Sequence, residues 1–320
     1  MPVPSAGPLG GLLQAEWGTD AHPHPALVGP GATGSTNALI VLRRTAFVPE
    51  GTAGVELSRQ AGQALVRWAQ DHDLGQVRED VLNAARRRER ALDQLRSQGK
   101  HVARVLLTPE WRLAVGLGEK GNAHELGLTL HGTYGWPLIP GSGLKGVTAA
   151  YVWGKAGGTT RGRQIFRTVF GTPLPPSRQD PDQEYGEGGT GTESRAELKD
   201  QGEERDGAAR GAVRFLDAFA VDGPVTVSAD VLTPHVKPYY DTTRARRQGE
   251  DPEPPAEHHQ PVPVHFLTIT GGTFAADLVG DTEQITEFAA NRLQEAVEDL
   301  GVGAKTAAGY GYMDAHRGEV

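Results

Sequence analysis

The C-terminal part of the chain carries the pattern that most restricts its fold, two strand-like runs followed by one long helix. Residues 264–278 are rich in strand-forming residues, and Gly271-Gly272 interrupts them in a way that favours a tight hairpin turn. In residues 281–300, Asp281 or Thr282 can cap a helix, Gln284 completes a capping box with Asp281, and Gly301 ends the helix. Its expected buried stripe is Ile285, Phe288, Ala289, Leu293, Ala296, Val297 and Leu300. A hairpin covered by such a helix predicts an α+β fold.

The N-terminal part predicts mainly helix. A possible short strand lies at residues 38–42, and residues 55–70 and 77–98 then repeat apolar side chains at helical spacing. The second helix and the residues just beyond it carry a series of basic side chains: Arg86, Arg87, Arg88, Arg90, Arg96, Lys100 and Arg104. Such a series is either a solvated helix face or a phosphate-binding stripe, and the pattern alone leaves both open.

From residue 102 the period changes to that of strands. Strands are expected at residues 102–117, 126–138, 213–218 and 225–230, a short helix at 143–153, and a final strand around 310–312. This mixed order predicts a modified ferredoxin-like or RNA-recognition-motif (RRM) fold, with a helical N-terminal region and long loop insertions. The expected division is a Gly/Pro-rich start plus helical region at residues 1–104 and an RRM-like domain at residues 105–320.

The formal net charge of −8 argues by itself against a nucleic-acid partner. The acidic residues, however, gather in one glycine-rich stretch, at Asp180, Asp182, Glu184, Glu187, Glu193, Glu197, Asp200, Glu203, Glu204 and Asp206. Arg195, Lys199 and Arg205 oppose them, and the rest of the chain is close to neutral. Residues 178–208 and 244–260 are expected to be disordered loops.

Several classes of protein are excluded by composition. The chain has no cysteine, so structural disulfides and thiolate metal sites are absent. No apolar run approaches the roughly 20 residues that span a bilayer, and the first residues lack a secretory signal. A soluble cytoplasmic protein without a membrane partner and without a cofactor is expected.

Two segments combine several glycines with one lysine, WPLIPGSGLKG at 136–146 and LGVGAKTAAGYG at 300–311. Glycine lets backbone amides approach a ligand, and a lysine among such amides at a helix N-terminus suits a phosphate. A helix beginning near Gly143 would have Ser142 as its cap and Lys145 in its first turn. The candidate phosphate-binding residues are Gly141, Ser142, Gly143, Lys145, Gly146, Gly301, Gly303, Lys305, Thr306, Gly309 and Gly311. Simple turn chemistry with exposed lysines is the alternative for either segment taken alone.

Nucleotide-processing motifs do not account for these segments. Residues 141–146 match G-x-G-x-x-G, but the dinucleotide fingerprint also needs an acidic residue about 20 positions later. The first acid after Gly141 is Asp180, inside the acidic loop. Neither segment has the Gly-Lys-Ser/Thr ending of a P-loop. Nucleotide hydrolysis is therefore not expected.

An ordered series of motifs resembles the RAMP superfamily, and within it the subunits of type III-B CRISPR (Cmr) effector complexes. LAVGLG at 113–118 and GLTLHGTYGWPLIPGSGLKG at 127–146 resemble its N-terminal signature, and GVGAKTAAGYG at 301–311 is similar to its defining glycine-rich loop. The motifs between them are VFG at 169–171, FLDA at 215–218, DVLTPH at 230–235, YY at 239–240 and PVPVHFL at 261–267. In two departures, Gly143 stands where a second serine is common and the acidic insertion is longer than expected.

The resemblance implies a non-catalytic RNA-binding subunit that holds the 3′-side of the guide RNA and caps the filament of backbone subunits. The implied partners are guide RNA, target RNA, and other RAMP and small subunits of the complex. Tyr134, Trp136, Tyr239 and Tyr240 are candidates for stacking on bases, although each could equally pack in the core.

Two other functions remain open. Some RAMP proteins cleave RNA without metal through a histidine, and His131 or His235 could act in this way. A pure scaffold that touches protein alone is the other. Asp217 and Asp230 could meet and bind a divalent ion, but isolated aspartates more often cap turns or pair with arginine, and no metal site is expected.

Overall fold

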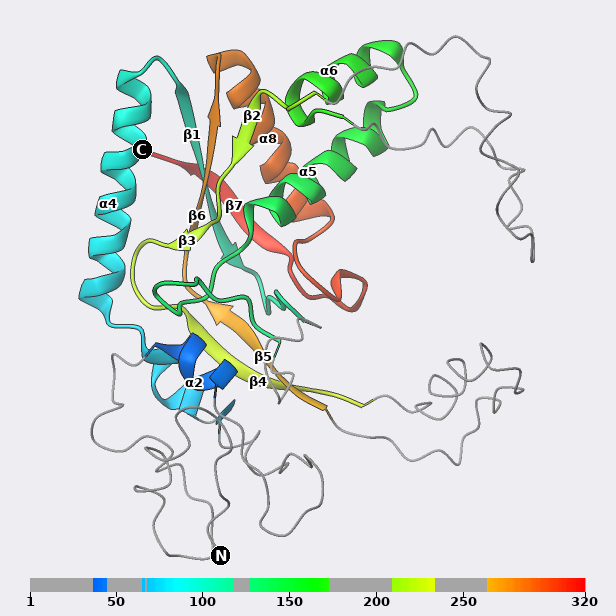
Figure 1. Cartoon of the computed structure of the whole chain (residues 1–320). Coiled ribbons are helices and arrows are strands. Elements are labelled where there is room, and N and C mark those ends of the chain that lie inside the picture. The colour runs from blue at the N-terminus through cyan, green and yellow to red at the C-terminus, as the bar shows by residue number, and fades with distance from the viewer. Residues whose placement is uncertain are drawn as a thin grey trace, which may run out of the picture.

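The computed structural model describes residues 37–44, 65–66, 68–117, 127–172, 209–233 and 264–319. The helices are α2 (Ala38–Arg44), α4 (Arg78–Ser97), α5 (Gly141–Ala156), α6 (Thr160–Phe170) and α8 (Glu283–Asp299), with short 3-10 turns η1 (Asp73–Gly75) and η4 (Thr306–Ala308). The strands are β1 (His101–Pro109), β2 (Val213–Phe215), β3 (Phe219–Ala220), β4 (Thr226–Leu232), β5 (Val264–Gly271), β6 (Phe274–Gly280) and β7 (Met313–Gly318). Figure 1 shows α4 along one side of the main sheet, with α5 and α8 on the other.

The main sheet has the ferredoxin-like arrangement. Its strands follow the order β2-β6-β1-β7, all pairs are antiparallel, and β3 also pairs with β6. Along the chain the core runs β1-α5-β2-β6-α8-β7, with α6, β3 and the pair β4–β5 inserted. The predicted α+β fold is confirmed.

The core lies between the sheet and the helices α5 and α8. Alternate residues of β6 point to this side, where Phe274, Ala276 and Leu278 belong to one buried cluster with Leu293 and Val297 of α8. Burial of such side chains supplies most of the stabilisation of a fold of this kind. The sheet and α8 therefore hold the ends of the strands, and the loops that leave them, in fixed positions.

The predicted hairpin at residues 264–278 is wrong in its pairing. β5 pairs with β4 in a separate two-stranded sheet, whereas β6 joins the main sheet. Gly271 and Gly272 do form a turn, but this turn carries the chain from one sheet to the other. Gly272 has a φ of 103°, and an added Cβ would lie 2.8 Å from Cγ1 of Val225. The residues of β6 are all buried, which places that strand inside the main sheet, away from β5.

The predicted strand at residues 38–42 is a helix. The side chain of Asn37 accepts a hydrogen bond from the Leu39 amide at 3.0 Å, and its carbonyl accepts from the Ile40 and Val41 amides. Ala38, Val41 and Leu42 are buried, a spacing that fits one face of a helix. The cap and the helical spacing of buried residues outweigh the strand preference of the two β-branched residues.

Among the other predicted strands, one does not form and the rest have different bounds. β1 ends at Pro109, and residues 110–117 continue it only as isolated bridges such as Leu113 with Ile269. Residues 127–138 form no strand, because turns with positive φ at Gly127 and Gly135 interrupt them. The last strand is β7, which begins at Met313 after the predicted residues 310–312.

The helices predicted at 77–98, 143–153 and 281–300 are confirmed as α4, α5 and α8; of the predicted caps, Thr282 and the stop before Gly301 are confirmed, whereas Ser142 is wrong. Pro140 is the N-cap of α5, so Ser142 lies inside the first turn. Thr282 is the N-cap of α8 and accepts no side-chain cap hydrogen bond. The capping box with Asp281 does not form, since that carboxylate pairs with Lys100 at 2.6 Å. Leu300, expected in the buried stripe, is 41% exposed.

Some predictions fall on residues that the structure does not describe. These include residues 55–64 of the first predicted helix, whose end is helical at 65–66 and 68–71, and both predicted loops at 178–208 and 244–260. The expected boundary after residue 104 lies within β1. Among the described helices, none is both long enough and apolar enough to cross a membrane.

Candidate nucleic-acid interface

Gly141 starts α5 where the helix approaches the chain after β2. An added Cβ would overlap the carbonyl oxygen of Phe215, so the position requires glycine. The Gly141 amide donates a 2.8 Å hydrogen bond to Oδ1 of Asp217. Gly141 therefore fixes the start of the helix, and its own amide already has a partner within the protein.

The following residues of α5 are open to solvent. Ser142, Gly143 and Gly146 are exposed, and an added Cβ at either glycine would meet nothing within 4 Å. Lys145 lies between the two glycines and is half-buried, and no ion pair joins it to another residue in the described ranges. Glycine inside a helix costs about 1 kcal/mol relative to alanine. Among the described residues, no contact requires glycine rather than alanine at position 143 or 146.

The loop at residues 301–311 adopts left-handed backbone conformations. Positive φ occurs at Gly301, Gly303, Gly309 and Gly311. Lys305 also has a φ of 63°, which costs a non-glycine residue about 1 kcal/mol or more. The amides of Ala308 and Tyr310 donate to the Lys305 carbonyl at 2.8 and 3.3 Å and hold it there, while Thr306 begins η4. Strain of this kind is often found where a side chain must be presented to a ligand.

One segment, residues 112–115, contacts both the loop at residues 301–311 and the chain that leads to α5. The Gly311 amide donates to the carbonyl of Arg112 at 2.8 Å, and the Ala304 amide donates to the carbonyl of Ala114 at 2.7 Å. On the side of α5, the Thr129 amide donates to the carbonyl of Val115 at 2.9 Å. The chain that leaves β1 therefore sets the positions of the loop and of the approach to α5 together.

Asp230 ties the small sheet to the glycine-rich loop. Its Oδ2 accepts a 2.7 Å hydrogen bond from Tyr310 and forms a 2.9 Å ion pair with Arg112. Partial burial acts to raise the pKa of Asp230, but the hydrogen bonds from Tyr310 and the Val231 amide and the charge of Arg112 outweigh it. The pKa of Asp230 therefore lies below its ordinary value of 3.8. Burial and the same hydrogen bond raise the pKa of Tyr310.

Trp111, which the sequence analysis did not single out, lies beside this loop. Its side chain is 54% exposed, its ring centroid is 5.2 Å from that of Tyr310, and the guanidinium of Arg112 lies 5.3 Å from its ring centre. The sequence feature that could have indicated Trp111 is an aromatic residue followed by an arginine just after a strand. An exposed ring of this size beside a glycine-rich loop suits stacking on an unpaired base.

The predicted aromatic residues near α5 form a stack. The ring of Tyr134 stacks on His131 at 4.7 Å and on Trp136 at 4.6 Å, and Phe219 meets His131 edge-on at 5.2 Å. Nδ1 of His131 accepts from the amides of Thr133 and Tyr134, so the neutral ring carries its proton on Nε2. Burial lowers the pKa of His131, and the charge of Asp217 opposes this in part.

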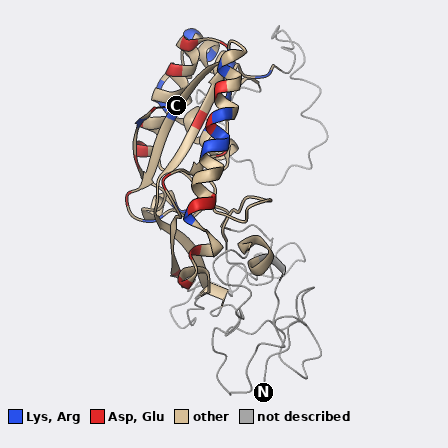
Figure 2. Ribbon diagram, turned by 90° about the vertical axis from the view of Figure 1, so that its left-hand side faces the viewer, with Lys and Arg blue, Asp and Glu red and all other residues tan. Residues whose placement is uncertain are grey.

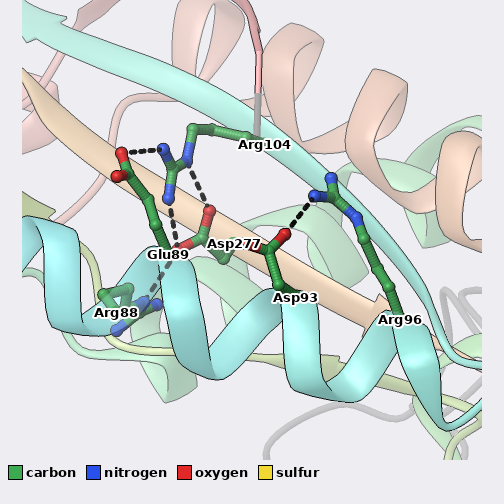
Figure 3. Close-up of polar contacts among 6 residues, drawn as sticks. All are labelled: Arg88, Glu89, Asp93, Arg96, Arg104 and Asp277. Carbon is green, nitrogen blue, oxygen red and sulfur yellow. Dashed lines mark hydrogen bonds and ion pairs between the residues drawn. The ribbon is translucent and has the colours of Figure 1, made fainter.

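The basic residues of α4 do not form a uniform stripe. Figure 2 shows blue and red residues interspersed along the helix. Arg88 reaches the buried carboxylate of Asp277 on β6 at 2.8 Å, and Arg104 of β1 bonds the same carboxylate at 2.7 Å (Figure 3). Arg96 pairs with Asp93 on the exposed side at 3.2 Å. Several of these cations are therefore used inside the protein, and α4 is held on the face of the sheet opposite α5 and α8.

The two aspartates considered for a metal ion serve different contacts. Asp217 accepts from Gly141, and Asp230 pairs with Arg112 and Tyr310. In the ranges that the structure covers, no group of three or more His, Cys, Asp and Glu side chains could hold a metal ion. His235, Tyr239 and Tyr240 lie outside the described residues.

Fold and site together define the class of the protein. The family model of the RAMP superfamily matches residues 98–314, and the chain belongs to that superfamily. The match begins just before β1 and ends within β7, so it contains both glycine-rich segments and all of the βαββαβ core except the end of β7.

The chain is homologous to a subunit of a CRISPR system. It is 29% identical over 229 residues to the CRISPR system Cmr subunit Cmr6 of Pyrococcus furiosus, and the match covers 63% of this chain and 64% of that relative. The chain thus spans less than two thirds of the length of that curated relative. A chain in the cryo-EM structure of the Type III-B Cmr-beta bound to cognate target RNA has a TM-score of 0.55 and 19% identity, over 80% of this chain and 71% of that chain, and shows the same fold. The crystal structure of Cmr6 from Pyrococcus furiosus has a TM-score of 0.35 and 25% identity, over 68% of this chain and 99% of that one.

Proposed function

We propose that this protein is an RNA-binding subunit of a type III-B Cmr complex, which holds the 3′-side of the guide RNA and caps the filament of backbone subunits. Its partners would be guide RNA, target RNA and the other Cmr-type subunits. Membership of the RAMP superfamily and homology to a Cmr6 subunit support this role.

The observation that carries the proposal is the pair of exposed helical glycines beside Lys145. Gly143 and Gly146 are one turn apart, so they lie on one face of α5. They lower helix stability, and no described contact needs them. Close approach of a phosphate backbone to α5 would explain the two glycines, because an added Cβ at either position would then clash with the backbone.

The glycine-rich loop would supply the second contact. Lys305 is held in a strained conformation by hydrogen bonds to its own carbonyl, and its ammonium group has no ion-pair partner among the described residues. Trp111 beside it offers a ring for stacking. Lysines would then neutralise phosphates while the aromatic residue contacts a base, a division that is common in the binding of single-stranded RNA.

The test is the salt dependence of guide-RNA binding in the assembled complex. Lys145→Ala and Lys305→Ala should each weaken binding about equally for all guide sequences, and each should reduce the slope of log affinity against log salt by about 0.7. Lys155→Ala, at the opposite end of α5, is the matched control and should change neither. If both lysine variants keep the affinity and the slope of the unchanged protein, the assignment of these sites is wrong.

We propose further that the chain does not itself cut RNA. The half-buried ring of His131 packs against Tyr134 and Phe219, and its Nδ1 accepts hydrogen bonds from two backbone amides, which supports a structural role for this histidine. The competing reading is a metal-independent endoribonuclease that uses His131 or His235 as general acid or base. RNA degradation by the purified chain that stops in His131→Ala or His235→Ala would establish the nuclease instead.

A further inference from the structure

A pocket of about 330 Å³ lies between α4, the aromatic stack, β3 and β6. Its wall includes His131, Tyr134 and Trp136 on one side, Arg87 on another, and Phe219. Ligand pockets in proteins span roughly 300–1,000 Å³, so this one is at the small end of that range. A single flat group fits such a volume better than a helix or an extended peptide does.

The wall is suited to a planar ring. Tyr134 has a ring neighbour on each face, at 4.7 Å in His131 and at 4.6 Å in Trp136, so Tyr134 itself is fully stacked. Trp136 ends the stack, and no other ring of the described residues is stacked on its second face. The hydrogen bonds to Nδ1 leave Nε2–H as the donor that His131 offers. A stacking face next to a hydrogen-bond donor is typical of sites that bind nucleobases.

The charges around the pocket favour an anion. Arg88 and Arg104 share the carboxylate of Asp277. Arg87 has no carboxylate partner in the described parts of the chain, and its Nη2 donates to the Tyr134 hydroxyl at 3.1 Å. The guanidinium also lies 5.6 Å from the Tyr134 ring centre. Arg87 is therefore a positioned cation at the edge of an aromatic pocket, where a phosphate attached to the bound ring would meet it.

We propose that this pocket binds one unpaired nucleotide, with its base against Trp136 and its phosphate on Arg87. The nucleotide could belong to an RNA strand or be free in solution, and both present the same base and phosphate. Where it belongs to RNA, the inference rests on the proposed function and adds a base-binding site to the contacts at Lys145 and Lys305. The pocket is separate from both lysines, neither of which lines it.

The experiment measures equilibrium binding of two probes to the full-length chain, fluorescent adenosine monophosphate and a single-stranded oligoribonucleotide. Trp136→Ala should weaken binding about tenfold through the loss of stacking, and Trp136→Phe should restore most of it. Arg87→Ala should weaken binding about tenfold through the loss of a charge-assisted hydrogen bond. Arg90→Ala is the matched control, since Arg90 is an exposed arginine of the same helix that does not line the pocket. Thermal melting of each variant verifies that the fold is kept, and Arg87, an exposed residue, can be replaced without loss of core packing.

The outcomes separate the pocket from the wider interface. Binding of the mononucleotide that depends on Trp136 and Arg87 supports the pocket with a free ligand, and the same dependence for the oligoribonucleotide alone assigns the nucleotide to RNA. RNA binding that depends on Lys145 and Lys305 but not on Arg87 or Trp136 overturns the pocket and keeps the proposed function. If neither probe binds, or if Arg90→Ala loses as much affinity as Arg87→Ala, the assignment of the pocket to a nucleotide is wrong. The pocket would then accept a side chain of a protein partner.

Discussion

Asp277 joins α4 to the main sheet through a buried carboxylate. Its side chain is fully buried and bonds both Arg88 of α4 and Arg104 of β1 (Figure 3). Asp277→Ala would leave the half-buried Arg88 without its carboxylate and the buried Arg104 with only its 3.6 Å contact to exposed Glu89, and we expect a loss of about 3–5 kcal/mol in the free energy of unfolding. Urea denaturation measures it. Asp93→Ala, which removes an ion pair of α4 on the exposed side, should cost less than about 1 kcal/mol. Equal effects of the two variants would contradict the role given to the buried network.

Asp230 should make stability depend on pH in the acid range. Its folded pKa is lowered from 3.8, so its stabilising effect is fully present above pH 3.8 and is lost as the pH falls through the folded pKa. At pH 7, Asp230→Asn should lower the free energy of unfolding by about 1–3 kcal/mol, because a hydrogen bond and an ion pair are weakened. Denaturation at a series of pH values should show the curves of the two proteins converging below pH 3.8. A constant difference down to the acid limit would mean that Asp230 does not titrate with a lowered pKa.

At the scale of elements, one methyl group added to α5 at Gly143 should stabilise the protein and weaken its binding to RNA. Gly143→Ala should raise the free energy of unfolding by about 0.5–1 kcal/mol, since the helix is favoured and the space is open. If a phosphate backbone approaches there, the same change should weaken RNA binding. Gly154→Ala is the control, as it lies in the same helix with nothing within 4 Å of its added Cβ, and it should stabilise without affecting RNA. Thermal melting of both variants measures the stabilisation, and RNA titration measures the affinity. Equal RNA affinities of the two variants would contradict close approach of RNA at Gly143.

Sequence patterns predicted the helices better than the pairing of strands. The spacing of Val81 and Leu92 in α4, or of Leu293 and Val297 in α8, is local and independent of what the helix packs against. Strand pairing depends on partners far along the chain, so Gly271-Gly272 identified a turn but not the change of sheet. The strand expected at 38–42 failed for a similar reason, because its burial is set by tertiary packing.

The site was predicted unevenly for the same reason. Lys145 and Lys305 stand out because glycines surround them in the sequence. The partners of Arg88 and Arg104 could not be predicted, since Asp277 is distant in the sequence and lies in a run of apolar residues. Nor could the chain order alone show that Arg87 and Trp136 line one pocket, because α4 reaches the aromatic stack only after folding onto the sheet.

At the scale of the whole molecule, α4 and the sheet should unfold as one unit. α4 buries only Val81 and Leu92 fully, so the contacts to Asp277 carry much of its attachment. In hydrogen exchange, the amides of α4 and β1 should therefore be protected to a similar extent in the unchanged protein. Asp277→Ala should lower protection in α4 more than in β6 and β7. Protection of α4 that stays high in this variant would show that apolar packing alone holds the helix.

The order of strands in the main sheet also sets when this protein can fold during its synthesis. β1 lies at the centre of the sheet, and both of its partners come late in the chain, with Val105 opposite Ala276 of β6 and Thr108 opposite Asp314 of β7. Contacts between such distant residues close slowly, because a long loop must be ordered first. The ribosome therefore releases β1 well before either neighbour exists, and this apolar strand must wait with one edge unpaired until β6 has been made and with the other edge unpaired until β7 has been made.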